Sequence, residues 1–205
     1  DMVLGLYYIT KPRPGVKGTG LKFYGPEEAI IAYNEKRAAL HANVKCRVRD
    51  VDENGEEVYR VVDTTVGRIL FNQNVPAEVG YINEVLTKRS LRDIIALVMK
   101  KAGAAKVAKF LDDIKNMGYL MAFKGGLSFN LDAVVIPEDK QKLIDEGYAA
   151  ADAVVEDYNM GLITNNERYN QIVDIWTNIN NKLTSQVINT LKSDQDGFNP
   201  VYMML

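Results

Sequence analysis

The stretch from residue 136 to residue 191 constrains the fold of this 205-residue chain most strongly. Its first half opens with Pro137, whose ring presets a helical φ. Two acidic residues follow, and their negative charges are stabilised by the positive N-terminal end of a helix dipole. Its second half opens with Thr164, and Glu167 follows three residues later at the spacing of a capping box. Apolar residues recur at three- and four-residue steps in both halves, so each helix needs a partner for one face. The sequence therefore predicts a projecting antiparallel two-helix coiled-coil hairpin with a short tip at residues 158–164.

The apolar seam of this hairpin is predicted from both helices. The first helix contributes Leu143, Gly147, Ala150 or Ala151, Val154 and Tyr158. The second contributes Tyr169, Ile172, Val173, Trp176, Ile179, Leu183, Val187 and Leu191. Opposite the seam, at about 100° per residue, lies a set of side chains that we call the polar arc: Glu167, Asn170, Gln171 and Asp174. The polar arc is either an ordinary solvated face or a docking surface.

Three apolar residues crowd the tip of the predicted hairpin. This apolar tip consists of Met160, Leu162 and Ile163. It favours the docking interpretation, although the same residues could equally close the end of the hairpin against itself.

Charge is distributed unevenly along the chain, although the net charge is only −2. Residues 1–49 carry nine Lys/Arg against four acids, residues 84–118 carry eight against four, and residues 138–157 carry two against seven. A basic body with an acidic arm could place phosphates on one part and a basic partner on the other. The single cysteine suits a reducing compartment, and we find no signal peptide or apolar run of membrane-spanning length, so we expect a cytoplasmic protein. Both ends fall within apolar runs, which indicates a piece of a longer polypeptide.

The rest of the chain predicts an α+β fold in four parts: a mixed β/α body (1–80), a helical middle (81–135), the hairpin (136–191) and a return segment (192–205). In the body we expect a buried strand or extended segment at 1–9 and a basic loop at 11–20. A helix from residue 26 to about 39 would bury Ile30, Ile31 and Tyr33. Strands at 44–48 and 57–62 would be joined by a turn at Asn54-Gly55, and residues 63–72 would turn into a further strand.

The helical middle is predicted to contain three helices. They span about 81–87, 91–101 with Ser90 as the cap, and 104–117 ending at Gly118.

Side chains that could carry catalysis are scarce. His41 and Cys46 are the only residues of their types, so they form no zinc site, and across a helix-to-strand junction they are not expected to meet as a catalytic dyad. The acid pairs Asp112-Asp113 and Asp50/Asp52 could hold Mg²⁺, but surface acids are far commoner. We predict no catalytic and no metal-binding residue, so the chain has the features of a binding or structural module.

Four sequence blocks, in this order, resemble the largest (β′) subunit of bacterial DNA-directed RNA polymerase. They are DMVLGLYYIT at 1–10, DTTVGRILFN at 63–72, GLITNNERYN at 161–170 with VDIW at 173–176, and NPVYMM at 199–204. No single block suffices, but together they span nearly the whole chain. Residues 1–80 look like the pore region and 81–135 like the funnel, while the hairpin looks like the rim helices at the mouth of the secondary channel.

The resemblance implies a role in DNA-templated transcription as part of a nucleotidyltransferase. The Mg²⁺-binding aspartates of that family should lie before residue 1, and Zn²⁺ is expected elsewhere in the subunit, so this segment should bind no cofactor and should be inactive alone. The implied partners are the β, α and ω subunits, Gre-type cleavage factors, and coiled-coil factors that act with guanosine tetraphosphate. Nucleoside triphosphates and the RNA 3′ end would pass through the channel of the complete enzyme, and no membrane is involved.

Particular residues follow from the resemblance. The rim-helix contacts map to Glu167, Arg168, Asn170 and Asp174. Gln171 completes the predicted partner-binding set, but it stands where well-known relatives have lysine, and a neutral amide cannot replace an ammonium group at a phosphate. The basic residues that could line the channel are Lys11, Arg13, Lys17, Lys88 and Arg89. Their alternative interpretation is a solvated surface.

Two other functions remain open from the sequence. The chain could be a freestanding adaptor whose hairpin binds a protein partner, or a self-contained enzyme that uses Asp112 and Asp113, although nothing else converges on that pair. A reading frame that continues upstream into an Asp-rich Mg²⁺ loop would favour the polymerase over the adaptor.

Overall fold

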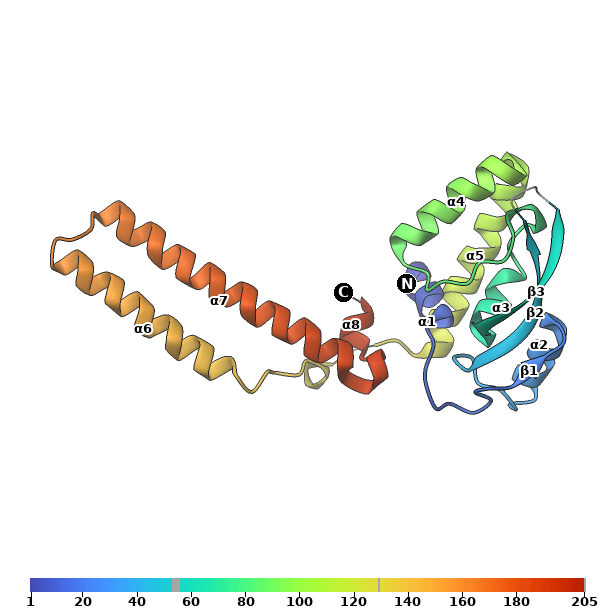
Figure 1. Ribbon diagram of the computed structural model, residues 1–205, viewed down its shortest axis with the longest axis horizontal. Coiled ribbons are helices and arrows are strands. Elements are labelled where there is room, and N and C mark those ends of the chain that lie inside the picture. The colour runs from blue at the N-terminus through green and yellow to red at the C-terminus, as the bar shows by residue number, and fades with distance from the viewer. Residues whose placement is uncertain (53–55, 129, 205) are drawn as a thin grey trace. The chain divides into compact units, whose positions relative to one another are not determined.

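The computed structural model describes residues 1–52, 56–128 and 130–204, which divide into two compact units, Asp1–Leu127 and Ser128–Leu205 (Figure 1). The first unit combines helices with a three-stranded sheet, and the second is helical. The predicted mixture of helices and strands is therefore confirmed. The finer four-part division and the coiled-coil character of the hairpin stay predictions.

The N-terminal segment is a helix, α1 (Met2–Thr10), and the predicted strand is wrong. α1 packs against two other helices, α5 (Ala104–Gly125) and α3 (Val66–Asn72). Because it is apolar on more than one side, its sequence shows no clear helical period. Gly5 and Gly118 allow the closest approach: a Cβ atom on Gly5 would lie 1.9 Å from the carbonyl oxygen of Gly118. Gly118 is thus a buried residue inside α5 and does not end it; the helix ends at Gly125, and Gly126 follows as its C-cap with φ 59°.

The sheet has the strand order β1 (Lys22–Phe23), β2 (Asn43–Val51) and β3 (Glu57–Thr65). β1 runs parallel to β2, and β2 pairs antiparallel with β3 from Asn43↔Thr65 to Val51↔Glu57. Val44, Cys46 and Val48 are buried, as the alternating pattern predicts. The predicted turn at Asn54-Gly55 lies outside the described residues.

Helix α2 (Pro26–Asn34) packs against the sheet through its small residues. Ala29 and Ala32 are buried in a cluster with the inner side chains of β2, whereas Ile31 is 57% exposed. The prediction that Ile31 is buried is therefore wrong, and the helix ends five residues before the predicted residue 39.

Residues 66–72 form helix α3, not the predicted strand. The signal that the sequence analysis missed is Thr65, whose hydroxyl accepts a hydrogen bond from the Arg68 amide at 3.3 Å and so caps the helix. The following segment contains only the short 3₁₀ helix η1 (Ala77–Val79).

The helix predicted at 81–87 is absent from the described structure, where these residues are irregular. Polar side chains of other elements hold them instead: the Asn72 amide pairs with the Ile82 backbone at 2.7 and 2.8 Å. The Leu86 amide donates to Thr10 Oγ1 at 2.9 Å. Helix α4 (Lys88–Ala102) then begins at a capping box of Thr87 and Ser90, so Ser90 is the third helical residue and not the predicted cap.

The second unit contains two long antiparallel helices, α6 (Lys140–Asn159) and α7 (Asn165–Ser193), as the sequence predicts. Its other elements are η2 (Leu131–Ala133), η3 (Asp194–Gly197) and α8 (Pro200–Met204). Asn199 is fully buried and donates to the Ala133 carbonyl at 2.9 Å and to the Asp194 carboxylate at 2.7 Å. This amide fixes the chain that enters α6 to the chain that leaves α7. Among the described helices, none combines the length and apolar composition needed to cross a lipid bilayer.

Candidate partner-binding site

The seam between α6 and α7 closes over a glycine. A Cβ atom on Gly147 would lie 2.4 Å from Ile179 Cδ1 and 3.1 Å from the Trp176 ring, so the missing side chain makes room for both. The Tyr148 ring meets Trp176 edge to face, with centroids 5.1 Å apart. Val154 is buried further along. The seam therefore holds the two helices at a fixed spacing, which determines what their outer faces present.

Three predicted members of the seam are more exposed than expected. Tyr169, Val173 and Tyr158 are 64%, 44% and 40% exposed. Two helices alone can bury only the line where they touch, and Tyr169 falls outside that line. Its assignment to the seam is wrong.

All four residues of the polar arc are exposed on α7. Glu167 already has hydrogen-bond partners within the chain: its carboxylate accepts hydrogen bonds from the Thr164 amide at 2.7 Å and from the Thr164 hydroxyl at 2.8 Å. These bonds stabilise the charged carboxylate and lower the pKa of Glu167. Within the described part of the chain, no hydrogen bond or ion pair engages the side chains of Asn170, Gln171 and Asp174.

Arg168 is held beside the polar arc by Asn165, which the sequence analysis did not single out, and by Tyr158, which it assigned to the seam. Asn165 Oδ1 accepts hydrogen bonds from its Nε at 3.2 Å and from its Nη2 at 2.8 Å. The guanidinium also lies 5.1 Å from the centroid of the Tyr158 ring. Arg168 therefore connects the end of α6 to the start of α7. The three-residue spacing of Asn165 and Arg168 in a predicted helix was the available signal.

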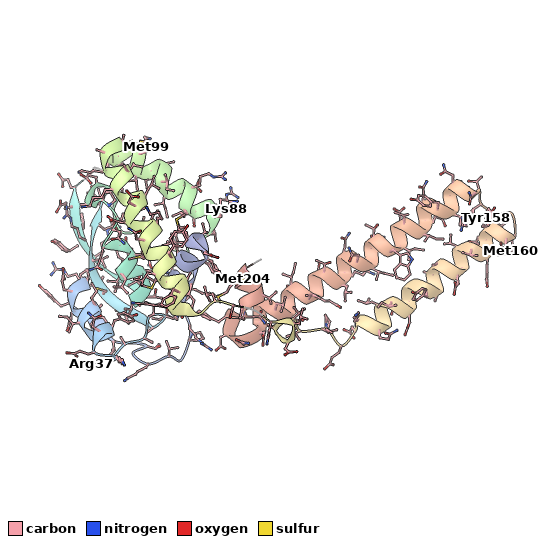
Figure 2. The ribbon with its side chains drawn as sticks, turned by 180° about the vertical axis from the view of Figure 1, so that it is seen from behind. Arg37, Lys88, Met99, Tyr158, Met160 and Met204 are labelled. Atoms are coloured by element: carbon pink, nitrogen blue, oxygen red, sulfur yellow. The ribbon has the colours of Figure 1, made fainter. Side chains whose placement is uncertain are left out.

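The apolar tip lies at the turn between the two helices, where Figure 2 shows Tyr158 and Met160. Met160 and Leu162 are 65% and 69% exposed, and Ile163 is half-buried. Gly161 adopts φ 78°, which allows the tight turn. Of the three apolar side chains of the tip, only Ile163 is half-buried, and Met160 and Leu162 remain exposed to solvent.

The structure anchors the two predicted basic segments near each other in the first unit. The Leu86 amide donates a hydrogen bond to Thr10, which directly precedes Lys11, and Leu86 lies two residues before Lys88, where α4 begins. Lys11 Nζ donates to the Tyr7 hydroxyl at 3.0 Å and lies 5.0 Å from the ring centroid. Lys17, Lys88 and Arg89 are exposed, and Arg13 is half-buried with its amide bonded to the His41 carbonyl at 3.0 Å. A role in a channel stays a prediction for all five residues.

His41 and Cys46 are both buried in the first unit, and their surroundings favour a structural role. His41 Nδ1 lies 2.9 Å from the Lys11 carbonyl oxygen, its ring meets Tyr8 edge to face at 4.6 Å, and burial lowers its pKa. Burial raises the pKa of the Cys46 thiol to about 11, which keeps it protonated and a poor nucleophile at neutral pH.

Both acid pairs include a carboxylate that makes local contacts. Asp112 pairs with Lys115 at 2.8 Å, and Asp50 Oδ1 accepts hydrogen bonds from the amides of Val51 and Tyr81. Within residues 1–52, 56–128 and 130–204, no cluster of three or more potential metal ligands occurs.

A cavity of about 260 Å³ lies in the first unit, lined by residues of α2, β2 and α3 and the segment that follows. Its lining includes Glu27, Val48, Ile69 and Tyr81. None of the predicted partner-binding, tip or channel-lining residues contributes to it.

Comparison with known proteins defines the class to which this chain belongs. Residues 1–134 match the family "RNA polymerase Rpb1, domain 3", and the chain therefore belongs to that family. Over its full length it is similar to DNA-directed RNA polymerase subunits beta′. It is 60% identical to that of Bacteroides thetaiotaomicron and 59% to that of Parabacteroides distasonis over 205 residues, and 53% to that of Flavobacterium psychrophilum over 210 residues. These matches cover all of this chain but only 14%, 14% and 15% of those relatives, respectively.

Proposed function

We propose that the chain acts within the β′ subunit of a DNA-directed RNA polymerase, where it forms part of the wall of the secondary channel for nucleotide entry. We further propose that the α6–α7 hairpin is a docking arm for protein factors that enter this channel, such as Gre-type cleavage factors. The family and the whole-length similarity support the polymerase assignment. They favour it over a freestanding adaptor, since each relative named above is a polymerase subunit.

The observation that carries the docking proposal is the polar arc. Asn170, Gln171 and Asp174 stand in a row on one exposed helix face, and among the described residues their polar groups have no partner. The capping box and the Arg168 contacts fix the start of this helix. The helix backbone holds these exposed polar groups in a fixed order along one face, where the polar groups of a partner can replace the water that hydrates them.

Charge indicates the kind of partner. Residues 138–157 of the hairpin carry seven acids against two lysines, and Asp174 adds to that negative field. A basic surface on the partner would therefore be attracted to the hairpin. Met160 and Leu162 at the tip would supply the apolar contacts, because large exposed side chains gain free energy when a partner removes them from water.

The direct test is capture of a Gre-type factor by complete polymerase that carries Asp174→Ala. Loss of one charged hydrogen-bonding group at an interface should weaken factor binding by roughly tenfold. Asp152→Ala also removes one exposed negative charge from the hairpin, but from α6 and not from the polar arc, so it measures the effect of the general negative field alone, and Asp174→Ala should weaken binding more. Equal recovery of the factor with Asp174→Ala and wild type would remove Asp174 from the site.

We also propose that the chain alone catalyses no nucleotidyl transfer, and that Mg²⁺ and Zn²⁺ in the complete subunit bind residues outside it. A nucleotidyl-transfer signal from the purified chain that EDTA abolishes would contradict this proposal.

A further inference from the structure

The outer face of the three-stranded sheet carries an arginine between two exposed tyrosines. We call Tyr24, Arg47 and Tyr59 the Tyr–Arg–Tyr row. The Arg47 guanidinium carbon lies 5.3 Å from the Tyr24 ring centroid and 4.7 Å from that of Tyr59. Tyr24 is 78% exposed and Tyr59 is 59% exposed. Two large aromatic surfaces and a cation therefore face solvent together.

The sheet fixes this row in place. β1 pairs Lys22 with Lys45 and Phe23 with Cys46, so the next residue, Tyr24, comes level with Arg47 on β2. Arg47 Nη1 donates to the Tyr24 hydroxyl at 2.9 Å, and the Tyr24 amide donates to the Glu28 carboxylate at 2.7 Å. The row thus runs from the residue after β1 across β2 to β3, and its geometry is set before any ligand arrives.

Cations surround the row on the same face. The alternation of the strands places Lys45 and Arg49 beside Arg47 on β2, and register places Lys22 beside Lys45. Lys45 pairs with Asp63 at 3.3 Å, and Arg49 pairs with Glu57. Both ion pairs are exposed, and exposed pairs contribute little stability, so their cations can exchange carboxylates for phosphates.

We propose that this sheet face binds an unpaired strand of nucleic acid, with bases stacked on Tyr24 and Tyr59 and phosphates held by Lys22, Lys45 and Arg49. Exposed aromatic rings flanked by cations on a sheet match both parts of such a strand, because every base has a flat π face and every linkage carries a negative charge. An apolar protein partner fits less well, since Val61 is the only aliphatic side chain on this face among the described residues of β2 and β3 that is both large and mostly exposed, at 70%.

These contacts involve bases and phosphates and not the sugar. DNA and RNA strands of equal sequence should therefore bind alike, whereas a duplex, whose bases are already stacked, should bind more weakly. The proposal concerns the first unit and is independent of the docking role of the hairpin, so either can fail alone.

Fluorescence anisotropy with the 205-residue chain and a labelled oligonucleotide of about 12 nucleotides tests the proposal. Tyr24→Ala and Tyr59→Ala should each weaken binding by roughly tenfold, while Tyr59→Phe should retain it, because the phenyl ring still stacks. Lys22→Gln should lower the slope of log affinity against log salt by about 0.7, the value for one phosphate contact with a single strand.

Tyr119→Ala is the matched control for aromatic removal, since Tyr119 is 55% exposed on α5 and not on the sheet. Arg92→Gln, on α4, controls for loss of one exposed positive charge. The proposal is overturned if the wild-type chain does not bind the single strand, if the duplex binds equally well, or if Tyr119→Ala weakens binding as much as Tyr59→Ala. Circular dichroism of each variant confirms that it is folded.

Discussion

Single glycines decide how closely the helices of each unit approach. At Gly118 a Cβ atom would lie 2.5 Å from the backbone oxygen of Met2, and backbone cannot move aside as a flexible side chain can. Gly118 was predicted to end its helix, because glycine is a common terminator and the sequence alone does not show what packs against it. Its physical role is visible only once α1 is in place.

We therefore expect Gly118→Ala to lower the free energy of unfolding by about 1–3 kcal/mol, the usual cost of overpacking. Gly125→Ala in the same helix is the control: its new methyl would meet the Tyr8 ring at 3.1 Å, and a side chain can shift. Gly125→Ala should leave the free energy of unfolding nearly unchanged, because the higher helix propensity of alanine, about 1 kcal/mol over glycine, offsets the cost of moving the Tyr8 ring. Urea denaturation followed by circular dichroism measures both. A midpoint for Gly118→Ala at or above that of Gly125→Ala would contradict the close helix contact.

Cys46 predicts a pH dependence of stability. Burial raises the pKa of its thiol from 9.0 to about 11. Above pH 9 the unfolded chain loses this proton first, so the contribution of the protonated thiol to stability, fully present below pH 9, is lost as the pH rises towards 11. Between those limits the wild type should lose more stability than Cys46→Ala. Tyr81, whose pKa burial raises to about 12, titrates in both proteins, so the main part of its contribution cancels in the comparison; the charge of Cys46 adds only a smaller part to that rise. Parallel urea midpoints across this range would show that the thiol does not titrate differently on folding.

At the scale of elements, a helix could be predicted where one face is apolar and its ends carry capping signals. The α6–α7 hairpin has both, and Thr164 and Glu167 form the predicted capping box. α1 has neither, because its residues contact other elements on several sides and Asp1 makes no capping bond. At α3 the capping residue Thr65 was present, but its β-branched neighbours also suit a strand. Tertiary contacts, not local preference, decide such segments.

The hairpin seam yields a prediction at this scale. Trp176→Ala removes the ring that covers Gly147 and meets Tyr148, and should lower the free energy of unfolding by about 2–3 kcal/mol. Tyr169→Ala should change it by less than about 0.5 kcal/mol, because that ring is 64% exposed. Urea titration of the helical circular dichroism signal compares the two variants. Equal losses would mean that Tyr169, too, belongs to the seam.

At the scale of the whole molecule, the candidate site could be predicted only in part. The polar arc followed from helical periodicity, and the residue roles came from the resemblance. The contacts of Arg168 with Asn165 and Tyr158 could not be predicted in the same way, since they depend on how α6 meets α7. The Tyr–Arg–Tyr row likewise needs the pairing of three strands, two of which are adjacent only in space.

The uneven charge of the chain supports one further prediction, on the proposed channel. Lys88 and Arg89 are exposed at the start of α4, and a positive potential there would raise the local concentration of nucleoside triphosphates. In the complete polymerase, Lys88→Glu with Arg89→Glu should raise the apparent KM for nucleotides by about three- to tenfold at low salt and leave kcat unchanged.

Lys100→Glu with Lys101→Glu is the matched control, because it makes the same charge change at the other end of the same helix. α4 has 15 residues, so the two pairs lie about 20 Å apart along it, roughly twice the distance over which about 0.1 M salt screens a charge. If nucleotides pass near Lys88, only the first pair should raise KM, and added salt should shrink the difference. An unchanged KM for the first pair, or an equal rise for both pairs, would show that these cations do not act locally on nucleotide entry.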